Sequence, residues 1–291
     1  MRALEKVSAG PQEPCGPVSW AEEILMTDAS QPLLMEHMTV EDMREALGRT
    51  RTVLIPLGVT EQHGYHLPLS TDVHNAYQVA RRVSVETGAV VAPPLWYSYS
   101  GGSLPGTINV APQVMALMVS EIIQSLVQQG FCNILLILGH AGTENLQALK
   151  DLVGLFLTRH PELCDVVVAL APVWEFSPTF MQAFEDHDYH AGYIETSLML
   201  HWAPDQVRAD RITQDDPDLA ASLRQHQDNY QRVERTIDDP HVAPRVTQRP
   251  EIKVGVMGFP EKASAEVGRQ VCDEMVSGIA GLVRRIEARR G

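Results

Sequence analysis

The stretch GVTEQHGYHLPLSTD, residues 58–72, combines two carboxylates and two histidines, namely Glu61, His63, His66 and Asp72. Carboxylate oxygens and imidazole nitrogens are the atoms that bind Zn²⁺, Mn²⁺ and Fe²⁺, and catalytic metal sites keep one position open for water. Glu61 and His63 are two residues apart, so both side chains can point to one side of an extended loop. Because a carboxylate such as Asp72 can bridge two ions, the stretch predicts a metal site with room for two.

A further histidine, His140, follows a second apolar run. The runs TVLIPL at residues 52–57 and NILLIL at residues 133–138 are apolar enough to be buried strands. Neighbouring parallel strands lie about 4.8 Å apart, and their carboxyl ends form the edge at which α/β proteins place their sites. We therefore expect His140 to join Glu61, His63 and Asp72. Each residue alone is more typical of a turn, a cap or a hydrogen-bonded histidine, but the combination favours a metal site.

Four other residues have a weaker case for function. His66 and His74 are more typical of surface or supporting positions than of metal ligands. Trp174 and Tyr97 could form pocket walls, and a place in the apolar core is an equally good interpretation of both. We treat these four residues as secondary candidates.

Strand-like and helix-like segments alternate along the chain. The predicted strands cover residues 52–57, 88–94, 133–138 and 165–171. The predicted helices cover residues 39–49, 73–86, 112–129, 143–160, 194–202 and 263–287. Thr39 is placed to cap the first of these helices. The alternation predicts an α/β fold with a largely parallel sheet that helices cover on both faces.

The length of 291 residues suits one large domain. We expect this domain to cover residues 31–291. Residues 1–30 contain three prolines and no sustained periodicity, which is typical of a tail or of an arm that lies on a neighbouring subunit. Residues 210–250 are acidic and then proline-bearing, and we interpret them as a surface excursion or a subunit contact.

The charge and the apolar pattern exclude several classes of partner. Lys and Arg number 23 against 37 Asp and Glu, so the net charge of −14 argues against binding to nucleic acid. No apolar run approaches the roughly 20 residues that span a membrane, and the first residues resemble no signal peptide. We therefore expect a cytoplasmic protein. Its four cysteines, far apart in the sequence, are expected to be isolated thiols.

Several stretches of this chain resemble the creatininase (creatinine amidohydrolase) family. They are PLGVTEQHGYHLPLSTD, LPGTI at residues 104–108, LGHAGTEN, HAGYIETSLML and GVMGFPEKASAEVG, which together run from about residue 50 to 285. The resemblance implies a three-layer α/β/α fold, a site for two divalent metal ions and the hydrolysis of a cyclic or linear amide. It also implies a homo-oligomer, often a hexamer in this family.

The resemblance assigns roles to individual residues. Glu61, His63 and Asp72 match the first ligand motif of the family, with Asp72 in the bridging position. His140 matches the ligand of the second motif. His190, in HAGYIETS, matches a histidine that acts in proton transfer.

The fifth metal ligand stays open between two glutamates. The usual NGHGGN of the family is LGHAGTEN here, so either Thr143 replaces the Asn or two residues are inserted before Asn145. With an insertion, Glu144 takes the place of the carboxylate that creatininase itself uses as a ligand. Glu195 follows His190 in the same motif, at a position that could also reach the metals.

Together these observations predict a metal-dependent hydrolase, an amidohydrolase with a small-molecule substrate. Two divalent ions (Zn, Mn or Fe) would lower the pKa of a bound water to about 7, giving a hydroxide that attacks the amide carbonyl. His190 would protonate the leaving group, a role worth about 10²- to 10⁴-fold in rate. The alternatives are the hydrolysis of a carbon–carbon bond in a cyclic sugar-derived diketone, the deformylation of a formamide, and a maturation partner without catalysis.

Overall fold

The computed structural model describes residues 31–289, and the residues from Pro32 onward form one compact unit. The expected tail or arm at residues 1–30 lies outside the described residues. The strands are β1 (Leu33–Leu34), β2 (Thr52–Leu57), β3 (Val90–Val91), β4 (Asn133–Leu138), β5 (Val167–Pro172), β6 (Gln231–Glu234) and β7 (Arg245–Gln248). The α-helices are α1 (Val40–Arg49), α2 (Thr71–Thr87), α3 (Pro112–Gln129), α4 (Thr143–Arg159), α5 (Pro178–Glu185), α6 (Tyr193–Trp202), α7 (Pro217–Leu223) and α8 (Ala265–Ala288). Short 3-10 helices cover Met35–His37, Pro161–Leu163, Val173–Phe176, Pro204–Gln206, Ala209–Arg211 and Pro260–Lys262.

The main sheet is parallel throughout, with the strand order β1-β3-β2-β4-β5. Its centre is formed by β2 and β4, whose residues are all buried. These two strands pair in register from Thr52 opposite Asn133 to Leu57 opposite Leu138. Both strands therefore end at the same level, and the two loops that carry the predicted ligands begin side by side.

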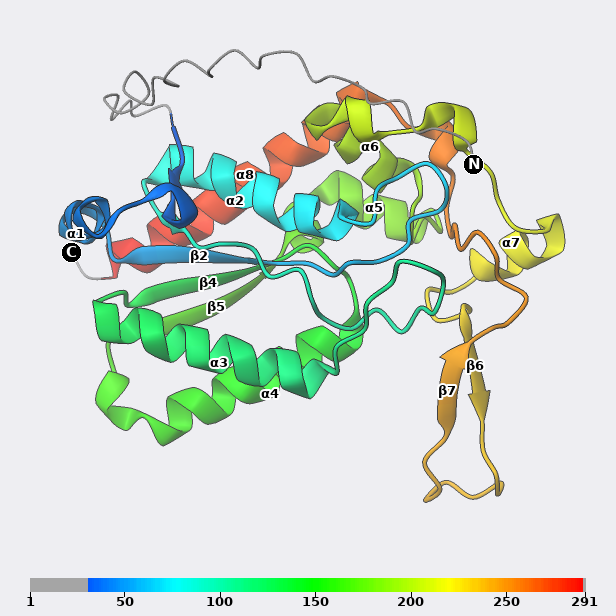
Figure 1. Cartoon of the computed structure of the whole chain (residues 1–291), viewed down its shortest axis with the longest axis horizontal. Helices are drawn as coiled ribbons and strands as arrows, with labels where there is room; N and C mark the ends of the chain where they lie inside the picture. Colours follow the sequence, from blue (N-terminus) through cyan, green and yellow to red (C-terminus); the bar gives the residue numbers. More distant parts are fainter. Residues whose placement is uncertain (1–30, 290–291) are drawn as a thin grey trace, which may run out of the picture. The chain divides into compact units, whose positions relative to one another are not determined.

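Helices cover both faces of the sheet (Figure 1). On one face α2, α6 and α8 contact one another, and on the other face α3 packs against α4. One large apolar core joins the sheet to helices of both layers. The three-layer α/β/α fold with a parallel central sheet is confirmed.

Two glycines allow α2 to begin very close to the sheet. A Cβ added to Gly58 would lie 2.5 Å from the backbone nitrogen of Val73, and one added to Gly139 would lie 2.1 Å from the backbone oxygen of Asp72. Such distances are shorter than any ordinary contact, so a side chain at either glycine would push α2 away. The first turn of α2, with Asp72, therefore lies directly at the ends of β2 and β4.

The predicted strands and helices are all observed, with ends that differ by at most three residues, whereas β1, α5, α7, β6 and β7 were not predicted. The strands 52–57 and 133–138 and the helix 112–129 have the predicted bounds. Thr39 caps α1 in a capping box, in which Asp42 accepts a hydrogen bond from the Thr39 backbone at 2.8 Å. The strand predicted over residues 88–94 is shorter because two prolines follow Ala92 and cannot donate ladder hydrogen bonds. The two-residue strand β1 is too short to give a pattern in the sequence.

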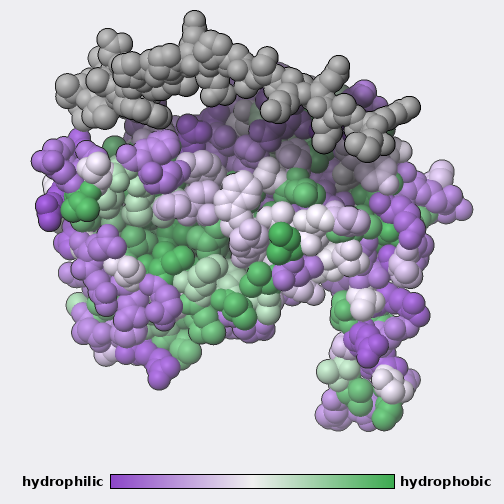
Figure 2. All heavy atoms as spheres, viewed as in Figure 1, coloured by the Kyte–Doolittle hydropathy of each residue, from purple (hydrophilic) through white to green (hydrophobic). Residues whose placement is uncertain are grey.

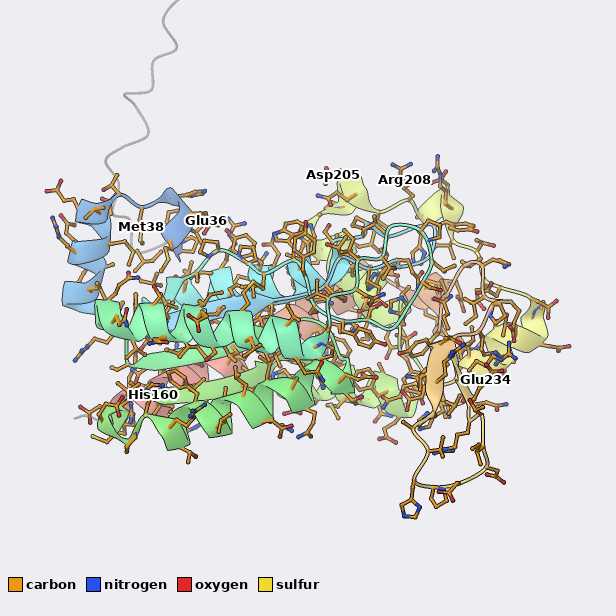
Figure 3. The ribbon with its side chains drawn as sticks, turned by 60° about the horizontal axis from the view of Figure 1, so that its bottom comes forward. Glu36, Met38, His160, Asp205, Arg208 and Glu234 are labelled. Atoms are coloured by element: carbon orange, nitrogen blue, oxygen red, sulfur yellow. The ribbon has the colours of Figure 1, made fainter. Side chains whose placement is uncertain are left out.

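Residues 210–250 form α7 and an antiparallel hairpin of β6 and β7. The hairpin projects away from the layers, and Glu234 marks it in the turned view (Figures 1 and 3). Val233 and Val246 face each other across its two strands, and both are exposed. The projecting part fits the predicted surface excursion, whereas the base of the hairpin reaches the pocket described below.

Two further expectations concern thiols and membranes. Cys132 and Cys272 are buried, Cys164 is exposed, and all three are free. This agrees with isolated thiols, and Cys15 lies outside the described residues. Among residues 31–289, no helix has the length and apolar character needed to cross a membrane.

Candidate metal centre

Asp72 lies between two histidines and presents one carboxylate oxygen to each. Its Oδ1 is 3.3 Å from His63 Nε2, and its Oδ2 is 3.0 Å from His140 Nδ1. A second carboxylate accompanies each histidine: Glu195 Oε1 lies 3.7 Å from His63 Nε2, and Glu61 Oε2 lies 3.3 Å from His140 Nδ1. The site therefore consists of two half-sites that share Asp72.

Each half-site has the dimensions of a metal site. Glu61, Asp72 and His140 each offer a ligand atom within 4.8 Å of the others, and so do His63, Asp72 and Glu195. A third such group combines Glu61 and His63 with His190. These overlapping groups share their members, as expected where two adjacent ions have a common carboxylate.

Buried ligand atoms without hydrogen bonds show that these residues fit divalent ions. Glu61 is 6% exposed and His63 is fully buried, yet Glu61 Oε2 and His63 Nε2 form no well-aligned hydrogen bond and approach other members of the cluster only at 3.3 Å or more. Buried polar atoms are costly to leave unpaired, so a ligand at these atoms is expected. His63 Nδ1 donates to the backbone oxygen of Glu61 at 3.1 Å, which leaves Nε2 as the nitrogen that can bind a metal.

The electrostatics of the cluster also suit a cation. Burial acts to lower the pKa of His140, but Asp72 and Glu61 outweigh it and raise that pKa to about 10. Burial likewise opposes a rise in the pKa of His63, and the carboxylates of Asp72 and Glu195 overcome it. Without an ion, protons on the two histidines balance the carboxylates. A bound ion would displace these protons.

The loop before α6 positions Glu195 and His190. Ala191 has a positive φ of 50°, an uncommon conformation for a residue with a Cβ, and its backbone N–H donates to Glu195 Oε2 at 2.7 Å. This hydrogen bond leaves Glu195 Oε1 on the side of His63. Backbone hydrogen bonds in both directions between His190 and Met257 hold the other end of the loop.

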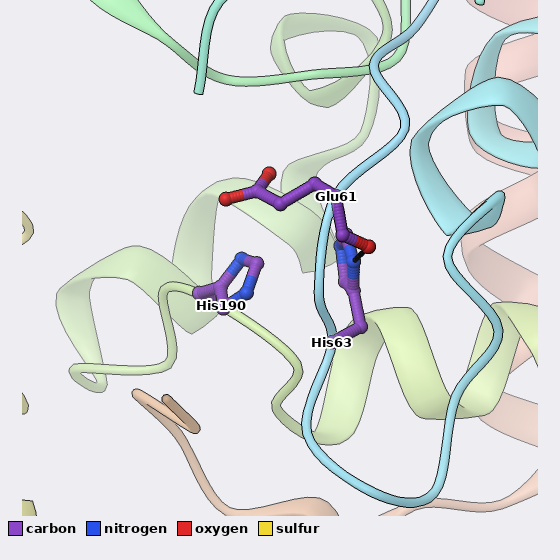
Figure 4. Close-up of side chains that lie close together, drawn as sticks. All are labelled: Glu61, His63 and His190. Atoms are coloured by element: carbon purple, nitrogen blue, oxygen red, sulfur yellow. Dashed lines mark hydrogen bonds between the residues drawn. The ribbon is translucent and has the colours of Figure 1, made fainter. Parts of the chain in front are cut away.

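His190 stands beside the cluster with its ring held at one nitrogen. Its Nε2 donates to the backbone oxygen of Gln62 at 2.8 Å, and the ring centroid is 4.3 Å from that of His63. Figure 4 shows Glu61, His63 and His190 around a common space. The side-chain amide nitrogen of Gln62 also lies 3.0 Å from Nε2, so Gln62 holds this side of the ring and Nδ1 is the other nitrogen of the ring.

Asp188 is a buried carboxylate that supports this loop. It accepts hydrogen bonds from the backbone N–H groups of Tyr193 at 2.9 Å and Phe259 at 2.8 Å. A Cβ on Gly192 or Gly258 would lie 2.0 or 2.2 Å from Asp188 Oδ1, so both glycines make room for the carboxylate. Burial raises the pKa of Asp188 to about 6, although these backbone hydrogen bonds lower it. Asp188 thus joins the start of α6 to the Phe259 segment and fixes the loop of His190.

A pocket of about 900 Å³, counted with its opening to solvent, gives access to the cluster. Glu61, His140, His190 and Glu195 line its inner part. Aromatic and amide side chains from other segments complete the walls, including Phe184, Tyr189, Gln227, Tyr230 and Gln248. Tyr230 directly precedes β6 and Gln248 is the last residue of β7, so the segment predicted only as a surface excursion or subunit contact also forms part of the pocket.

The two candidate fifth ligands occupy different places. Glu195 lies in the cluster with His63 and Asp72, and its side chain is 12% exposed. Glu144 is exposed in the first turn of α4, accepts a hydrogen bond from the Thr143 hydroxyl at 3.3 Å, and lines the pocket. Among the described residues Glu144 belongs to none of the ligand groups. The geometry therefore favours Glu195 as the ligand.

The secondary candidates lie outside the pocket. Trp174 is 8% exposed in the apolar core, which was one of its two interpretations, and Tyr97 is half-exposed but does not line the pocket. His66 is buried behind the cluster, where its Nε2 meets the Thr196 hydroxyl at 3.0 Å. Burial first, and then the nearby His63, lower the pKa of His66 to about 4, which keeps it neutral. His74 does not line the pocket either.

Sequence patterns alone gave no role to Gln62 or Asp188. Gln62 is the residue between Glu61 and His63, and its backbone oxygen and side chain both contact His190. Asp188 precedes His190 by two residues. The sequence feature that could have indicated a functional role for Asp188 is its position beside the HAG motif, with glycines nearby.

Comparison with known proteins shows the family to which the chain belongs. The family model described as creatininase, creatinine amidohydrolase, matches residues 36–283. This chain therefore belongs to the creatininase family. It is a hydrolase of that family, as the resemblance in its motifs implied.

Named relatives cover most of the chain. The mycofactocin precursor peptide peptidase of Mycolicibacterium smegmatis is 31% identical over 243 residues, which cover 80% of this chain and 84% of the relative. The creatinine amidohydrolase of Pseudomonas putida is 30% identical over 249 residues, which cover 80% and 88%. A solved creatininase variant described as "Zn-Zn type" superposes with a TM-score of 0.70 at 27% identity, covering 88% of this chain and 98% of that chain.

Proposed function

We propose that this protein hydrolyses a cyclic amide or a small linear amide with the help of two divalent metal ions. The observation that carries the proposal is the position of Asp72, whose two oxygens face two different histidines at 3.3 and 3.0 Å. The names of the relatives support amide chemistry, because one is an amidohydrolase and one a peptidase. The zinc form of a related creatininase supports zinc as one suitable ion, beside manganese and iron.

Five side chains would hold the ions. Glu61 and His140 would bind one ion and His63 and Glu195 the other, with Asp72 between them. Ions at these positions supply Lewis acidity, which polarises an amide carbonyl and acidifies water. The buried carboxylates are already oriented, since Ala191 fixes Glu195 and the close approach at Gly139 fixes Asp72. Little reorganisation is therefore needed on binding.

His190 would move the proton in this reaction. Its Nε2 is held by the backbone of Gln62, and its side chain lines the pocket beside Glu61. A protonated Nδ1 can donate to the nitrogen that leaves when the amide C–N bond breaks. Without this proton the leaving group would depart as an unstable anion.

We also propose that copies of the chain associate in the cytoplasm. Val114, Leu117 and Met118 are exposed together on α3, where Figure 2 shows apolar residues gathered on the surface. Apolar side chains gathered in this way are typical of contacts between proteins. Light scattering on the purified protein gives the number of subunits, and a monomer at working concentration would contradict this point.

Metal removal and return test the proposed activity. We expect chelation to abolish hydrolysis of a panel of cyclic and linear amides, and Zn²⁺, Mn²⁺ or Fe²⁺ to restore it. Asp72→Asn should lose both ions and lower kcat/KM on the order of 10⁴-fold, since it removes ligands of both half-sites. Asp205→Asn is the matched control, because Asp205 is exposed on the surface (Figure 3).

Two results would contradict the proposal. Hydrolysis that persists in protein shown by elemental analysis to be free of metal would exclude a metal-dependent reaction. Full metal binding without hydrolysis of any amide would favour the alternatives, namely a carbon–carbon hydrolase or a maturation partner without catalysis. An assay with ketone-bearing cyclic substrates then separates these two alternatives, because only a carbon–carbon hydrolase would cleave them.

A further inference from the structure

The segment of residues 253–259 lies alongside His190 and is joined to it. Backbone hydrogen bonds in both directions connect Met257 of this segment with His190. Two valines of the segment are buried in a small apolar cluster with Ala191, the residue that follows His190. The position of His190 therefore depends on where this segment lies.

Asp215 holds the first turn of this segment with both oxygens of its carboxylate. Its Oδ1 accepts hydrogen bonds from the backbone N–H groups of Lys253 at 2.7 Å and Val254 at 3.0 Å. Its Oδ2 accepts one from the backbone N–H of Gly255 at 2.8 Å. Hydrogen bonds to an ionised acceptor are about twice as strong as those between neutral groups, so Asp215 fixes the turn firmly.

Gly255 connects this turn to Gln62. Gly255 is buried with a positive φ of 77°, and a Cβ on it would lie 2.6 Å from Gln62 Nε2. The absence of a side chain therefore lets the Gln62 amide lie directly on the backbone of the turn. Gln62 Nε2 is also 3.5 Å from the Gly255 carbonyl oxygen. A displaced turn would leave the Gln62 side chain without this support.

The amide of Gln62 in turn faces the imidazole of His190. Its Oε1 accepts a hydrogen bond from the Gly64 N–H at 3.1 Å, which leaves its Nε2 on the side of the imidazole. Gln62 Nε2 lies 3.0 Å from His190 Nε2, and the backbone oxygen of Gln62 lies 2.8 Å from the same nitrogen. Both groups hold one nitrogen of the ring, so the direction of Nδ1 depends on Gln62.

We propose that Asp215 is a positioning residue for His190 and acts through Gly255 and Gln62. Its carboxylate keeps the turn against Gln62, and Gln62 keeps the imidazole directed for proton transfer to the leaving group. In the described part of the chain, Asp215 neither lines the pocket nor belongs to a ligand group, so its effect is indirect. A misplacement of about 1 Å at a reacting group can cost roughly 10²-fold in rate. The inference rests on the proposed amide hydrolysis for the role of His190.

Asp215→Asn tests the restraint at Gly255 in particular. The remaining Oδ1 can still accept the two hydrogen bonds from residues 253 and 254, but the new NH₂ group meets the Gly255 N–H, and two donors repel each other. We expect a crystal structure of the metal-loaded variant to show Gly255 and Gln62 displaced and the His190 imidazole rotated. Both metal ions should remain in place.

Two leaving groups show whether the variant has lost proton transfer. An amine needs a proton to leave, whereas 4-nitrophenolate leaves without one. Asp215→Asn should lower kcat about tenfold for an amide that the unmodified protein hydrolyses, and less than about twofold for the 4-nitrophenyl ester of the same acid. KM should stay within about twofold for both. Asp215→Glu keeps the carboxylate and should restore most of the lost amide kcat.

A double-mutant cycle tests the route through Gln62. Gln62→Met keeps the length of the side chain, removes the amide, and should also lower the amide kcat about tenfold. In that background Asp215→Asn should add less than about twofold, because the group through which Asp215 acts is gone. Asp216→Asn is the matched control: Asp216 neighbours Asp215 but accepts its hydrogen bond from the Asp218 N–H of α7, at 3.0 Å. This control should leave the amide kcat unchanged.

Separate readouts distinguish failure of this inference from failure of the proposed activity. Undisplaced Gln62 and His190 in the Asp215→Asn structure, equal losses for amide and ester, or additive losses in the double variant would overturn the positioning role. Loss of a metal ion in Asp215→Asn would also overturn it, because the effect would then arise at the metal centre. A displaced His190 in that structure, together with no hydrolysis of any amide by the unmodified protein, would support the positioning and contradict the amide hydrolysis.

Discussion

The inner and outer parts of the pocket are built in opposite ways. At the inner end, Glu61, His63 and Asp72 are at most 6% exposed, and they follow or abut the central strands of the sheet. At the outer end, Glu144 and Asp228 are exposed and come from the start of α4 and from the segment before the hairpin. The buried inner end is suited to one fixed chemistry, whereas residues at the exposed outer end can be substituted with little loss of stability.

The reason for this difference lies in what each part packs against. Inner residues are constrained by backbone contacts, such as the one that requires glycine at position 139. Outer residues rest on hydrogen bonds of side chains near the surface, such as those of the Tyr230 hydroxyl with Ser100 and Gln231. Changes at the inner end should therefore alter metal binding and turnover, and changes at the outer end should alter mainly KM.

Among the changes that should leave both metal ions in place, the largest effect is expected at His190, which borders both parts. His190→Ala should lower kcat by about 10²- to 10⁴-fold, because the leaving nitrogen loses its proton donor. Both metal ions should remain, since five other ligands hold them. Steady-state kinetics with elemental analysis measure both quantities, and His160→Ala at the end of α4 (Figure 3) is the control. Loss of an ion in His190→Ala would make His190 a ligand.

Gly139→Ala tests the close approach at the inner end. The new Cβ would lie 2.1 Å from the backbone oxygen of Asp72 and must displace α2. We expect about 1–3 kcal/mol of lost stability and roughly 10- to 100-fold weaker metal binding, measured by chemical unfolding and metal titration. Gly154→Ala on α4 is the control, because its Cβ meets no atom within 4 Å and should leave metal binding unchanged. Unaltered metal affinity in Gly139→Ala would contradict the role of this contact.

The metal-free protein should lose stability as the pH rises. The folded-state pKa of His140 is raised to about 10, above the 6.5 of an unperturbed histidine. Its stabilising contribution is therefore complete below pH 6.5 and disappears as the pH rises through 10. We expect the Tm in chelator to fall by roughly 5 °C between pH 6.5 and 10. The metal-loaded protein should lack this trend, because bound ions replace the protons, and a flat profile in chelator would contradict the assignment.

The smallest effect is expected at the outer end. Tyr230→Phe removes the hydroxyl that donates to Ser100, an interaction worth about 0.5–1.5 kcal/mol. We expect KM to rise roughly threefold while kcat and metal content stay unchanged. Tyr65→Phe is the control, since the Tyr65 hydroxyl makes a similar bond to Lys253 outside the pocket. A large fall in kcat would show that the two ends are not separate.

The sequence by itself determined the layered fold, the central strands and the motifs with Glu61, His63, Asp72 and His140. These features follow from local signals, because buried parallel strands are continuously apolar and the residues after them meet at one edge. Helix starts such as Thr39 are equally local.

Only the tertiary structure decided how the distant segments complete the site. It placed Glu195 rather than Glu144 beside His63, 132 positions away in the sequence, and it put Tyr230 in the pocket instead of Trp174 or Tyr97. The physical reason is that such contacts depend on the path of loops, which composition and periodicity do not encode. A positive φ at Ala191 and a carboxylate fitted between glycines set that path around His190.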